Sequence, residues 1–147
     1  MERPLVLHAT AVAWEGRAVL ILGASGSGKS SLGLALMAWG CALVADDRTE
    51  VRAAGGRLLA SAPGPLKGLI EARGVGLLRS EADPEAPVVL VVDLDHIETE
   101  RLPPWREATI LGVRLPLLHK PSTGPFAAAI LQYLKGGRAA PAPEDDP

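Results

Sequence analysis

The stretch Leu20–Leu36, LILGASGSGKSSLGLAL, joins an apolar run to a helical pattern through three closely spaced glycines. Within it, residues 23–30 fit the pattern G-x-x-x-x-G-K-[ST] in full, with a buried-strand pattern before it and a helical pattern after it. Glycines let successive backbone N–H groups converge on phosphate oxygens, and the N-terminus of the following helix adds a favourable dipole. The stretch therefore predicts a phosphate loop that binds a nucleoside triphosphate.

This motif assigns roles to single residues. Lys29 can reach the outer phosphates, and the Ser30 hydroxyl can hold Mg²⁺. The residues expected to contact ATP are Gly23, Ala24, Ser25, Gly26, Ser27, Gly28, Lys29, Ser30 and Ser31. The motif thus predicts ATP and Mg²⁺ as ligands, but it does not identify the group that accepts the phosphate.

Composition limits the class of protein. A length of 147 residues suits one domain, and an apolar share of 48% suffices for a core. The net charge of −2 argues against nucleic-acid binding, which usually needs a basic stripe. The longest uncharged stretch, residues 30–45, is too short to span a membrane, and the N-terminus lacks the features of a signal peptide. We expect a cytoplasmic protein without a nucleic-acid or membrane partner.

Hydrophobic patterning predicts an α/β fold with the phosphate loop between a central strand and a helix, and with a partly antiparallel sheet. The expected strands are Leu5–Trp14, Arg17–Leu22, Ala42–Ala45, Val88–Leu94 and Gly112–Leu118, with a hairpin formed by Thr49–Ala53 and Arg57–Ala60. The expected helices are Ser30–Trp39 and Gly124–Lys135, and the expected surface loops include Ser80–Pro87 and Glu98–Arg106. Residues 1–136 are expected to form the domain, and residues 137–147 a disordered tail rich in proline and acid.

Two acidic strand ends compete for the metal-binding role. In VVLVVDLD, residues 88–95, five apolar residues precede Asp93, so this segment is the stronger pattern. In ALVADD, residues 42–47, two adjacent carboxylates allow one to hold a metal-bound water while the other takes a proton from an attacking hydroxyl. Alternatively, Asp93 and Asp95 are turn residues that follow a strand, and Asp46 or Asp47 caps a turn.

Taken in order, these residues resemble the catalytic domain of the HPr kinase/phosphorylase family, the bacterial serine kinases of the phosphocarrier HPr. Four features carry the resemblance: His8 on the strand fifteen residues ahead of Gly23, the phosphate loop that runs into a helix, V-A-D-D at Val44–Asp47, and E-x-R-G-x-G at residues 71–76. The match is close from His8 to Leu78. It continues more loosely through ERLPPWREATILGVRLP, residues 100–116.

The resemblance implies a fold similar to the HPr kinase C-terminal domain and a role for each matching residue. His8 and Lys29 would lie near the transferred phosphate, and Arg73 and Gly74 would support the phosphate site. Asp46 and Asp47 would form an acid/base pair, and Ser30 and Glu71 would serve Mg²⁺. Arg101 would match an arginine on a mobile loop of the family. Following chain order, we assign the metal water to Asp46 and the proton to Asp47. Two alternatives remain: His8 as a core histidine, and Arg73 as an ion-pair partner of Glu71.

The function that the resemblance implies is ATP-dependent phosphorylation of a serine of HPr, which regulates carbohydrate uptake through the phosphotransferase system. The chain departs from the family pattern in SEADPEAP, residues 80–87, and in KPSTGP, residues 120–125, where the family has a G-R-N segment tied to phosphorolysis. The family's N-terminal domain and long C-terminal helices are also missing, so the chain resembles a short form. We therefore expect weak reverse activity and leave a homo-oligomer open. The alternative functions are a small-molecule kinase and a non-catalytic nucleotide-binding regulator.

Overall fold

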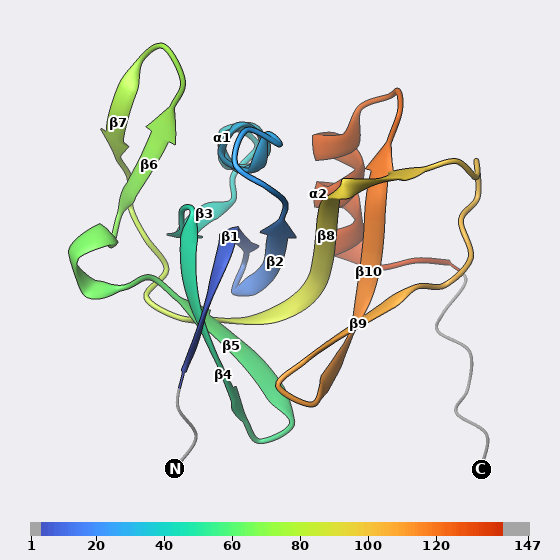
Figure 1. Cartoon of the computed structure of the whole chain (residues 1–147), viewed down its shortest axis with the longest axis horizontal. Coiled ribbons are helices and arrows are strands. Elements are labelled where there is room, and N and C mark those ends of the chain that lie inside the picture. Colours follow the sequence, from blue (N-terminus) through green and yellow to red (C-terminus); the bar gives the residue numbers. More distant parts are fainter. Residues whose placement is uncertain (1–3, 140–147) are drawn as a thin grey trace.

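The computed structural model describes residues 4–139, which form an eight-stranded sheet, a separate two-stranded hairpin and two helices (Figure 1). The strands are β1 (Leu5–Trp14), β2 (Arg17–Leu22), β3 (Ala42–Ala45), β4 (Arg48–Ala54), β5 (Arg57–Ser61), β6 (Leu69–Ala72), β7 (Gly76–Arg79), β8 (Ala86–Glu98), β9 (Glu107–Ile110) and β10 (Val113–Pro121). The helices are α1 (Lys29–Ala38) and α2 (Phe126–Gly136), and a 3₁₀ turn covers Gly64–Leu66.

The topology brings four strand ends to one edge of the sheet. Along the sheet the order is β2-β1-β4-β5-β8-β10-β9, β3 pairs with β1, and β2 also pairs with β8, so the sheet curls back on itself. Strands β2, β8 and β10 are parallel, and β3 shares their direction because β1 is antiparallel to both β2 and β3. The glycine-rich loop of residues 23–28 leaves this edge and leads into α1 (Figure 1).

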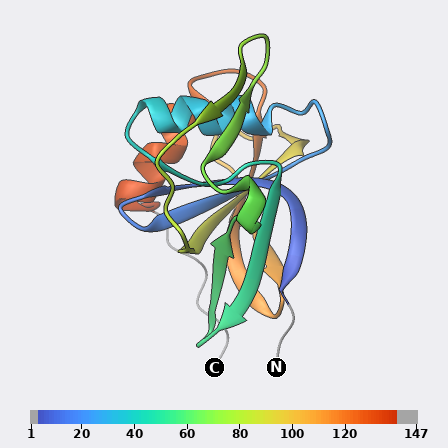
Figure 2. The same ribbon diagram turned by 90° about the vertical axis from the view of Figure 1, so that its left-hand side faces the viewer.

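The sheet is covered on both faces by apolar side chains. Ala11 and Leu20 belong to a core enclosed by the curved sheet, whereas their neighbours Val12 and Ile21 belong to a second core that includes Leu36 of α1 and Ile130 and Leu134 of α2. Successive residues of a strand point to opposite faces. Burial on both faces explains why residues 18–22 are all apolar, and both helices lie on the same face of the sheet (Figure 2).

Helix α1 approaches β1 closely at Gly33. A Cβ atom at Gly33 would lie 3.0 Å from the Thr10 methyl carbon, which is tighter than almost any real contact of this kind. The absence of a side chain at this position therefore lets the helix pack directly on β1. The first turn of the same helix reaches the end of β3, where the Ser30 hydroxyl donates to Asp46.

The predicted α/β fold with a partly antiparallel sheet is confirmed, but the boundaries around β8 are corrected. This strand runs from Ala86 to Glu98, beyond the predicted limits at Val88 and Leu94. It takes its first residues from the predicted loop 80–87, because Ala86 and Pro87 pair with β5. It takes Glu98 from the predicted exposed loop 98–106, because the Arg106 guanidinium neutralises this carboxylate, which is buried.

Two hairpins were not predicted from the sequence. Strand β9 pairs with β10 through Leu111 and Gly112, which have φ values of 48° and 78°. Turns with two positive φ values are usually marked by Asn-Gly or Asp-Gly, so Leu-Gly carries little signal. The β6–β7 hairpin stands apart as its own small sheet (Figure 1). In the predicted tail of residues 137–147, positions from 140 onward lie outside the described residues.

No helix among residues 4–139 combines the length and the apolar character that crossing a lipid bilayer would require.

Candidate active site

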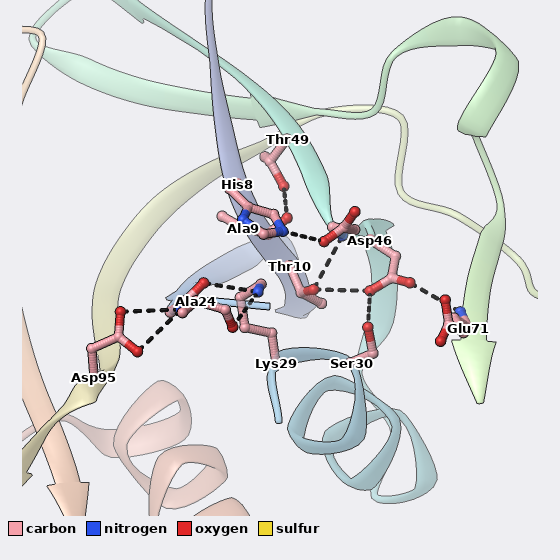
Figure 3. A network of polar contacts seen from close by, with 12 residues as sticks. His8, Ala9, Thr10, Ala24, Lys29, Ser30, Asp46, Thr49, Glu71 and Asp95 are labelled. Atoms are coloured by element: carbon pink, nitrogen blue, oxygen red, sulfur yellow. Dashed lines mark hydrogen bonds and ion pairs between the residues drawn. The ribbon is translucent and has the colours of Figure 1, made fainter. Parts of the chain in front are cut away.

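Asp46 is the centre of a polar network at the end of β3 (Figure 3). Its Oδ1 accepts hydrogen bonds from the hydroxyls of Thr10, at 2.8 Å, and Ser30, at 2.6 Å, and its Oδ2 accepts one from the backbone N–H of Glu71, at 2.9 Å. The residue is 9% exposed. Groups from β1, α1 and β6 thus fix this carboxylate. Since each carboxylate oxygen has two lone pairs, Oδ2 retains one acceptor position.

Asp47 is held by its backbone and presents its side chain outward. Its φ is 65°, a left-handed conformation that aspartate adopts more readily than most residues. Its N–H donates to the Thr10 hydroxyl at 3.2 Å, and its carbonyl accepts from Ala9 N at 3.0 Å. Its Oδ1 lies 2.6 Å from His8 Nε2, and both side chains are about half exposed. The backbone contacts with β1 therefore place an accessible carboxylate beside a histidine.

The 23–30 loop folds tightly around Lys29. This side chain is only 5% exposed, and its Nζ donates to the carbonyls of Gly23, at 2.8 Å, and Ala24, at 3.1 Å (Figure 3). A Cβ atom at Gly23 would crowd the Ser27 side chain, whose own Cβ would be 3.0 Å away, and Gly23 has a φ of 157°, so both space and backbone conformation favour glycine at the first position of the motif. The loop therefore holds its positive charge near its own backbone.

Two cavities meet at Asp47. The first, which we call the loop cavity, has a volume of about 300 Å³ and is lined by residues of the 25–31 segment together with Asp46, Asp47, Glu71 and Arg73. The second, which we call the His8 cavity, has a volume of about 420 Å³ and is lined by Val6, Leu7, His8, Ser25, Asp47 and Arg48. Ser25 and Asp47 line both cavities, so Asp47 lies at the border between them.

The acids of β8 are placed differently. Asp93 accepts a hydrogen bond from Asp95 N at 2.9 Å, and its Oδ2 lies 2.8 Å from His96 Nδ1. Both oxygens of Asp95 lie 3.1 Å from the N–H of Ala24, at the start of the loop (Figure 3). The alternative in which Asp93 and Asp95 follow the strand as turn residues is wrong, since both lie within β8. Neither lines the loop cavity.

Most of the predicted site residues lie around the loop cavity, but Gly74 and Arg101 do not line it. Ser30, Ser31, Asp46, Asp47, Glu71 and Arg73 all line the loop cavity. Gly74, with a φ of 82°, lies in the turn of the β6–β7 hairpin. Among residues 4–139, no ion pair joins Arg73 to Glu71. Arg101 does not reach the loop cavity and instead lines a further cavity beside α2.

Sequence reasoning missed Thr10 and the contact that Asp95 makes with the loop. Thr10 is fully buried and connects Asp46 with the backbone of Asp47. A hydroxyl in the middle of the apolar strand LVLHATAVAW was the available signal, because buried polar groups are nearly always hydrogen-bonded. Asp95 offered no comparable signal, since its contact with Ala24 depends on the register of β2 and β8.

The oxygen donors of the loop cavity fit a magnesium ion. Mg²⁺ prefers oxygen ligands and is usually held by one or two carboxylates together with substrate phosphates and water. The Ser30 hydroxyl, the remaining lone pair of Asp46 Oδ2 and the carboxylate of Glu71 are donors of this kind. Within the described part of the chain, no group of three or more His, Cys, Asp or Glu side chains is close enough to hold a metal by itself.

Together, the fold and the site define a mixed α/β domain in which a glycine-rich loop joins a parallel strand to a helix. Comparison with known proteins shows which family this is. Residues 2–117 match the family model described as the HPr serine kinase C-terminal domain, and the chain belongs to this family.

The relatives agree with this assignment. The HPr kinase/phosphorylase of Limosilactobacillus reuteri (strain DSM 20016) is 36% identical over 140 residues, covering 86% of this chain and 44% of that protein. That of Caldicellulosiruptor bescii is 46% identical over 72 residues, covering 48% of this chain and 23% of that protein. The chain therefore spans less than half the length of these two relatives. A solved structure of the Hpr(Ser) kinase/phosphatase from Coxiella burnetii matches with a TM-score of 0.72 and 25% identity, covering 89% of this chain and 93% of that one.

Proposed function

We propose that this chain is an ATP-dependent protein kinase that transfers the γ-phosphate of ATP to a serine of HPr. Family membership supports this proposal, and one structural observation carries it: Asp47 borders both the loop cavity and the His8 cavity. A hydroxyl entering from the His8 cavity would meet the carboxylate of Asp47 at the border of the cavity that the phosphate loop lines. A base placed between two cavities suits transfer between two different molecules.

In this proposal each residue has a defined task. Asp47 takes the proton of the serine hydroxyl, and His8 orients the Asp47 carboxylate through the 2.6 Å contact. The serine oxygen forms a bond to the γ-phosphorus while the bond to the oxygen that bridges the β- and γ-phosphates breaks. Lys29 and the backbone N–H groups of the loop stabilise the developing negative charge. Asp46, Ser30 and Glu71 would hold Mg²⁺, which neutralises phosphate charge when bound.

The surface beside the His8 cavity supports a macromolecular acceptor. Leu5 and Val6 are 41% and 53% exposed although they lie on a strand, and Val6 also lines the cavity. Exposed apolar side chains around a reactive group favour docking of a protein rather than of a small polar molecule. We infer that HPr would dock here, in the cytoplasm, and that its phosphorylation would regulate carbohydrate uptake.

The decisive experiment is incubation of the full chain with labelled ATP, Mg²⁺ and HPr, followed by analysis for acid-stable phosphoserine. We expect Lys29→Ala to lower the rate of transfer at least about a hundredfold, because the Lys29 charge lies where negative charge develops. Lys67→Ala is the matched control, since Lys67 is an exposed lysine outside the three cavities described here.

The outcomes separate the competing functions. ATP binding without any phosphoprotein product would favour a nucleotide-binding regulator. Transfer of the label to a small molecule but not to HPr would favour a small-molecule kinase. For the reverse reaction, phosphate added to phosphorylated HPr should release little pyrophosphate, because KPSTGP lacks the arginine fork that holds phosphate oxygens well.

A further inference from the structure

We propose that the cavity beside α2 binds the nucleoside of the bound triphosphate. This α2 cavity has a volume of about 500 Å³ and lies between the ends of β8 and β10 and the start of α2. The proposal rests on the proposed function in one respect, namely that the 23–30 loop holds the phosphates. The loop cavity alone, at about 300 Å³, lies at the lower end of the range typical of small-molecule sites.

The strand register places the α2 cavity next to the loop. Leu22, the last residue of β2, pairs with Asp93 of β8. Asp93 also pairs with His119 of β10, so the three residues lie side by side across the sheet. Strand β8 continues to Glu98, which pairs with Pro121 of β10. Pro121 is only two residues beyond His119, so this end lies roughly 7 Å further at about 3.3 Å per residue, and the extra residues of β8 form a bulge. These two strand ends therefore lie beside the loop, and the contact between Asp95 and Ala24 shows that β8 touches it.

The α2 cavity also lies on the opposite side of the loop from His8, Asp46 and Asp47. Strand β1, which carries His8, and strand β3, which is followed by Asp46, lie on one side of β2. Strands β8 and β10 lie on the other side (Figure 1). In open α/β sheets, ligands bind across the carboxyl ends of parallel strands. A triphosphate with its γ-phosphate at Asp47 would therefore extend its nucleoside over the ends of β8 and β10.

The residues of the α2 cavity suit a purine nucleoside. Leu118, Pro103 and Phe126 provide apolar surface for a flat base, and Phe126 adds an aromatic ring. Thr123 provides a hydroxyl for the base or the ribose, and Arg101 provides positive charge for the first phosphate. Mostly apolar walls with a few polar groups are typical of sites that bind small organic ligands. This assigns Arg101 to the nucleotide rather than to the transferred phosphate.

One wall of the cavity is fixed by a buried ion pair. The Glu98 carboxylate accepts hydrogen bonds from Arg106 Nε, at 3.0 Å, and Nη2, at 3.1 Å, and from the backbone N–H groups of Thr99 and Glu100. The Arg106 guanidinium holds the pKa of Glu98 at about 2, so the carboxylate stays charged at neutral pH. The 98–106 segment is short, but these contacts hold it in place as a preformed wall of the cavity.

The test compares binding of ATP with binding of tripolyphosphate, which lacks the nucleoside, to the full chain by calorimetry. Ala129 lies on the exposed side of α2 and lines the cavity, so Ala129→Phe fills the cavity without removing a core contact. Ala128→Phe is the matched control, since its neighbour Ala128 is exposed on the same helix and does not line the cavity. We expect Ala129→Phe to weaken ATP binding at least about tenfold, because the base loses its apolar contacts. Its affinity for tripolyphosphate should equal that of the wild type and of Ala128→Phe.

Any one of three results would overturn the inference. The wild type could bind ATP and tripolyphosphate with equal affinity, or Ala129→Phe could bind ATP as tightly as the wild type. The third result is that Ala129→Phe loses affinity for ATP and for tripolyphosphate by the same factor. In the last case the effect would not be confined to the nucleoside. None of these measurements requires phosphate transfer. A chain that binds ATP through this cavity but forms no phosphoserine would refute the proposed kinase activity and leave the nucleoside site standing.

Discussion

Strands β3 and β8 both place acids near the same loop, β3 directly after its last residue and β8 within its length, and the weaker sequence pattern forms the more complete site. Strand β3 has only four residues, yet Asp46 at its end contacts Ser30 at 2.6 Å. Strand β8 has thirteen residues and a longer apolar run, but Asp95 contacts only the first turn of the loop, at Ala24. The length of an apolar run reports how deeply a strand is buried. It does not report which part of the loop the strand end faces.

Position relative to α1 explains the difference. Strand β3 ends beside the first turn of this helix, where Ser30 and the N–H of Glu71 complete the contacts of Asp46. The carboxylate of Asp93 is instead bound to His96 and to the backbone of its own strand. The end of β3 is therefore placed for the metal binding and proton transfer proposed above, whereas Asp95 within β8 contacts the start of the loop.

The largest expected effect comes from exchanging one acid of each segment, Asp47 after β3 and Asp93 within β8, for its amide. Asp47→Asn should lower phosphate transfer at least about a hundredfold while leaving ATP affinity nearly unchanged, because the acceptor needs a base and the nucleotide does not. Asp93→Asn should leave the rate of transfer within about twofold of the wild type, since its carboxylate faces His96 rather than the loop cavity. The measurement is the rate of phosphoserine formation on HPr. An inactive Asp93→Asn together with an active Asp47→Asn would reverse the comparison between the two strand ends.

The second prediction concerns the packing that holds the end of β3 against α1. In Gly33→Ala the new Cβ would press on Thr10 at 3.0 Å, and Thr10 positions Asp46. We expect a net loss of about 1–2 kcal/mol in the free energy of unfolding, because overpacking costs more than the gain in helix propensity. The rate of transfer should fall roughly tenfold as Asp46 shifts.

Gly136→Ala is the matched control for this prediction, because Gly136 is also helical but has open space around it, with only the Gln132 amide at 3.5 Å. It should stabilise the chain by up to about 0.5–1 kcal/mol and leave the rate unchanged. Urea unfolding of both variants gives the two free energies. A stabilised, fully active Gly33→Ala would show that α1 does not depend on close packing against Thr10.

The sequence predicted the parts of this molecule that depend on local pattern. The loop, both helices and the β4–β5 hairpin follow from glycine spacing and apolar periodicity within short windows. The convergence of Ser30, Asp46 and Glu71 could be predicted only through the family resemblance, because these residues lie far apart in the chain.

Features that depend on pairing between distant strands could not be predicted from local pattern. The extension of β8 to Glu98 depends on its pairing with Pro121 of β10 and on Arg106, and neither is encoded within β8 itself. Burial on both faces also hides the direction of each side chain. An apolar run therefore predicted a strand here without predicting that Asp95 would reach the loop.

The third prediction tests the ion pair that fixes the far end of β8. The pKa of Glu98 is lowered from 4.5 to about 2, so its ionised form stabilises the fold. This contribution is present above pH 4.5 and is lost as the pH falls through the folded-state pKa of about 2. Glu98→Gln lacks it, so its melting temperature should lie a few degrees below that of the wild type at pH 6, and the gap should close between pH 4.5 and pH 2. Glu81→Gln, at an exposed position, should show no such gap. A gap that is independent of pH would mean that packing, and not the charge of Glu98, holds this segment.

The smallest expected effect concerns Asp95, the acid of β8 that touches the loop. Its carboxylate accepts the hydrogen bond that the Ala24 N–H donates, and it adds negative charge where a triphosphate would bind. Asp95→Asn keeps an acceptor for this N–H but removes the charge, so ATP should bind roughly threefold more tightly at low ionic strength. Salt screens charges at an exposed site, so the gain should vanish near 1 M salt. Asp93→Asn, two residues earlier on the same strand, controls for the general loss of one negative charge and should change the dissociation constant for ATP much less. Weaker ATP binding by Asp95→Asn at all salt concentrations would show that the charged carboxylate is needed to shape the loop. Acids from both β3 and β8 would then be part of the nucleotide site.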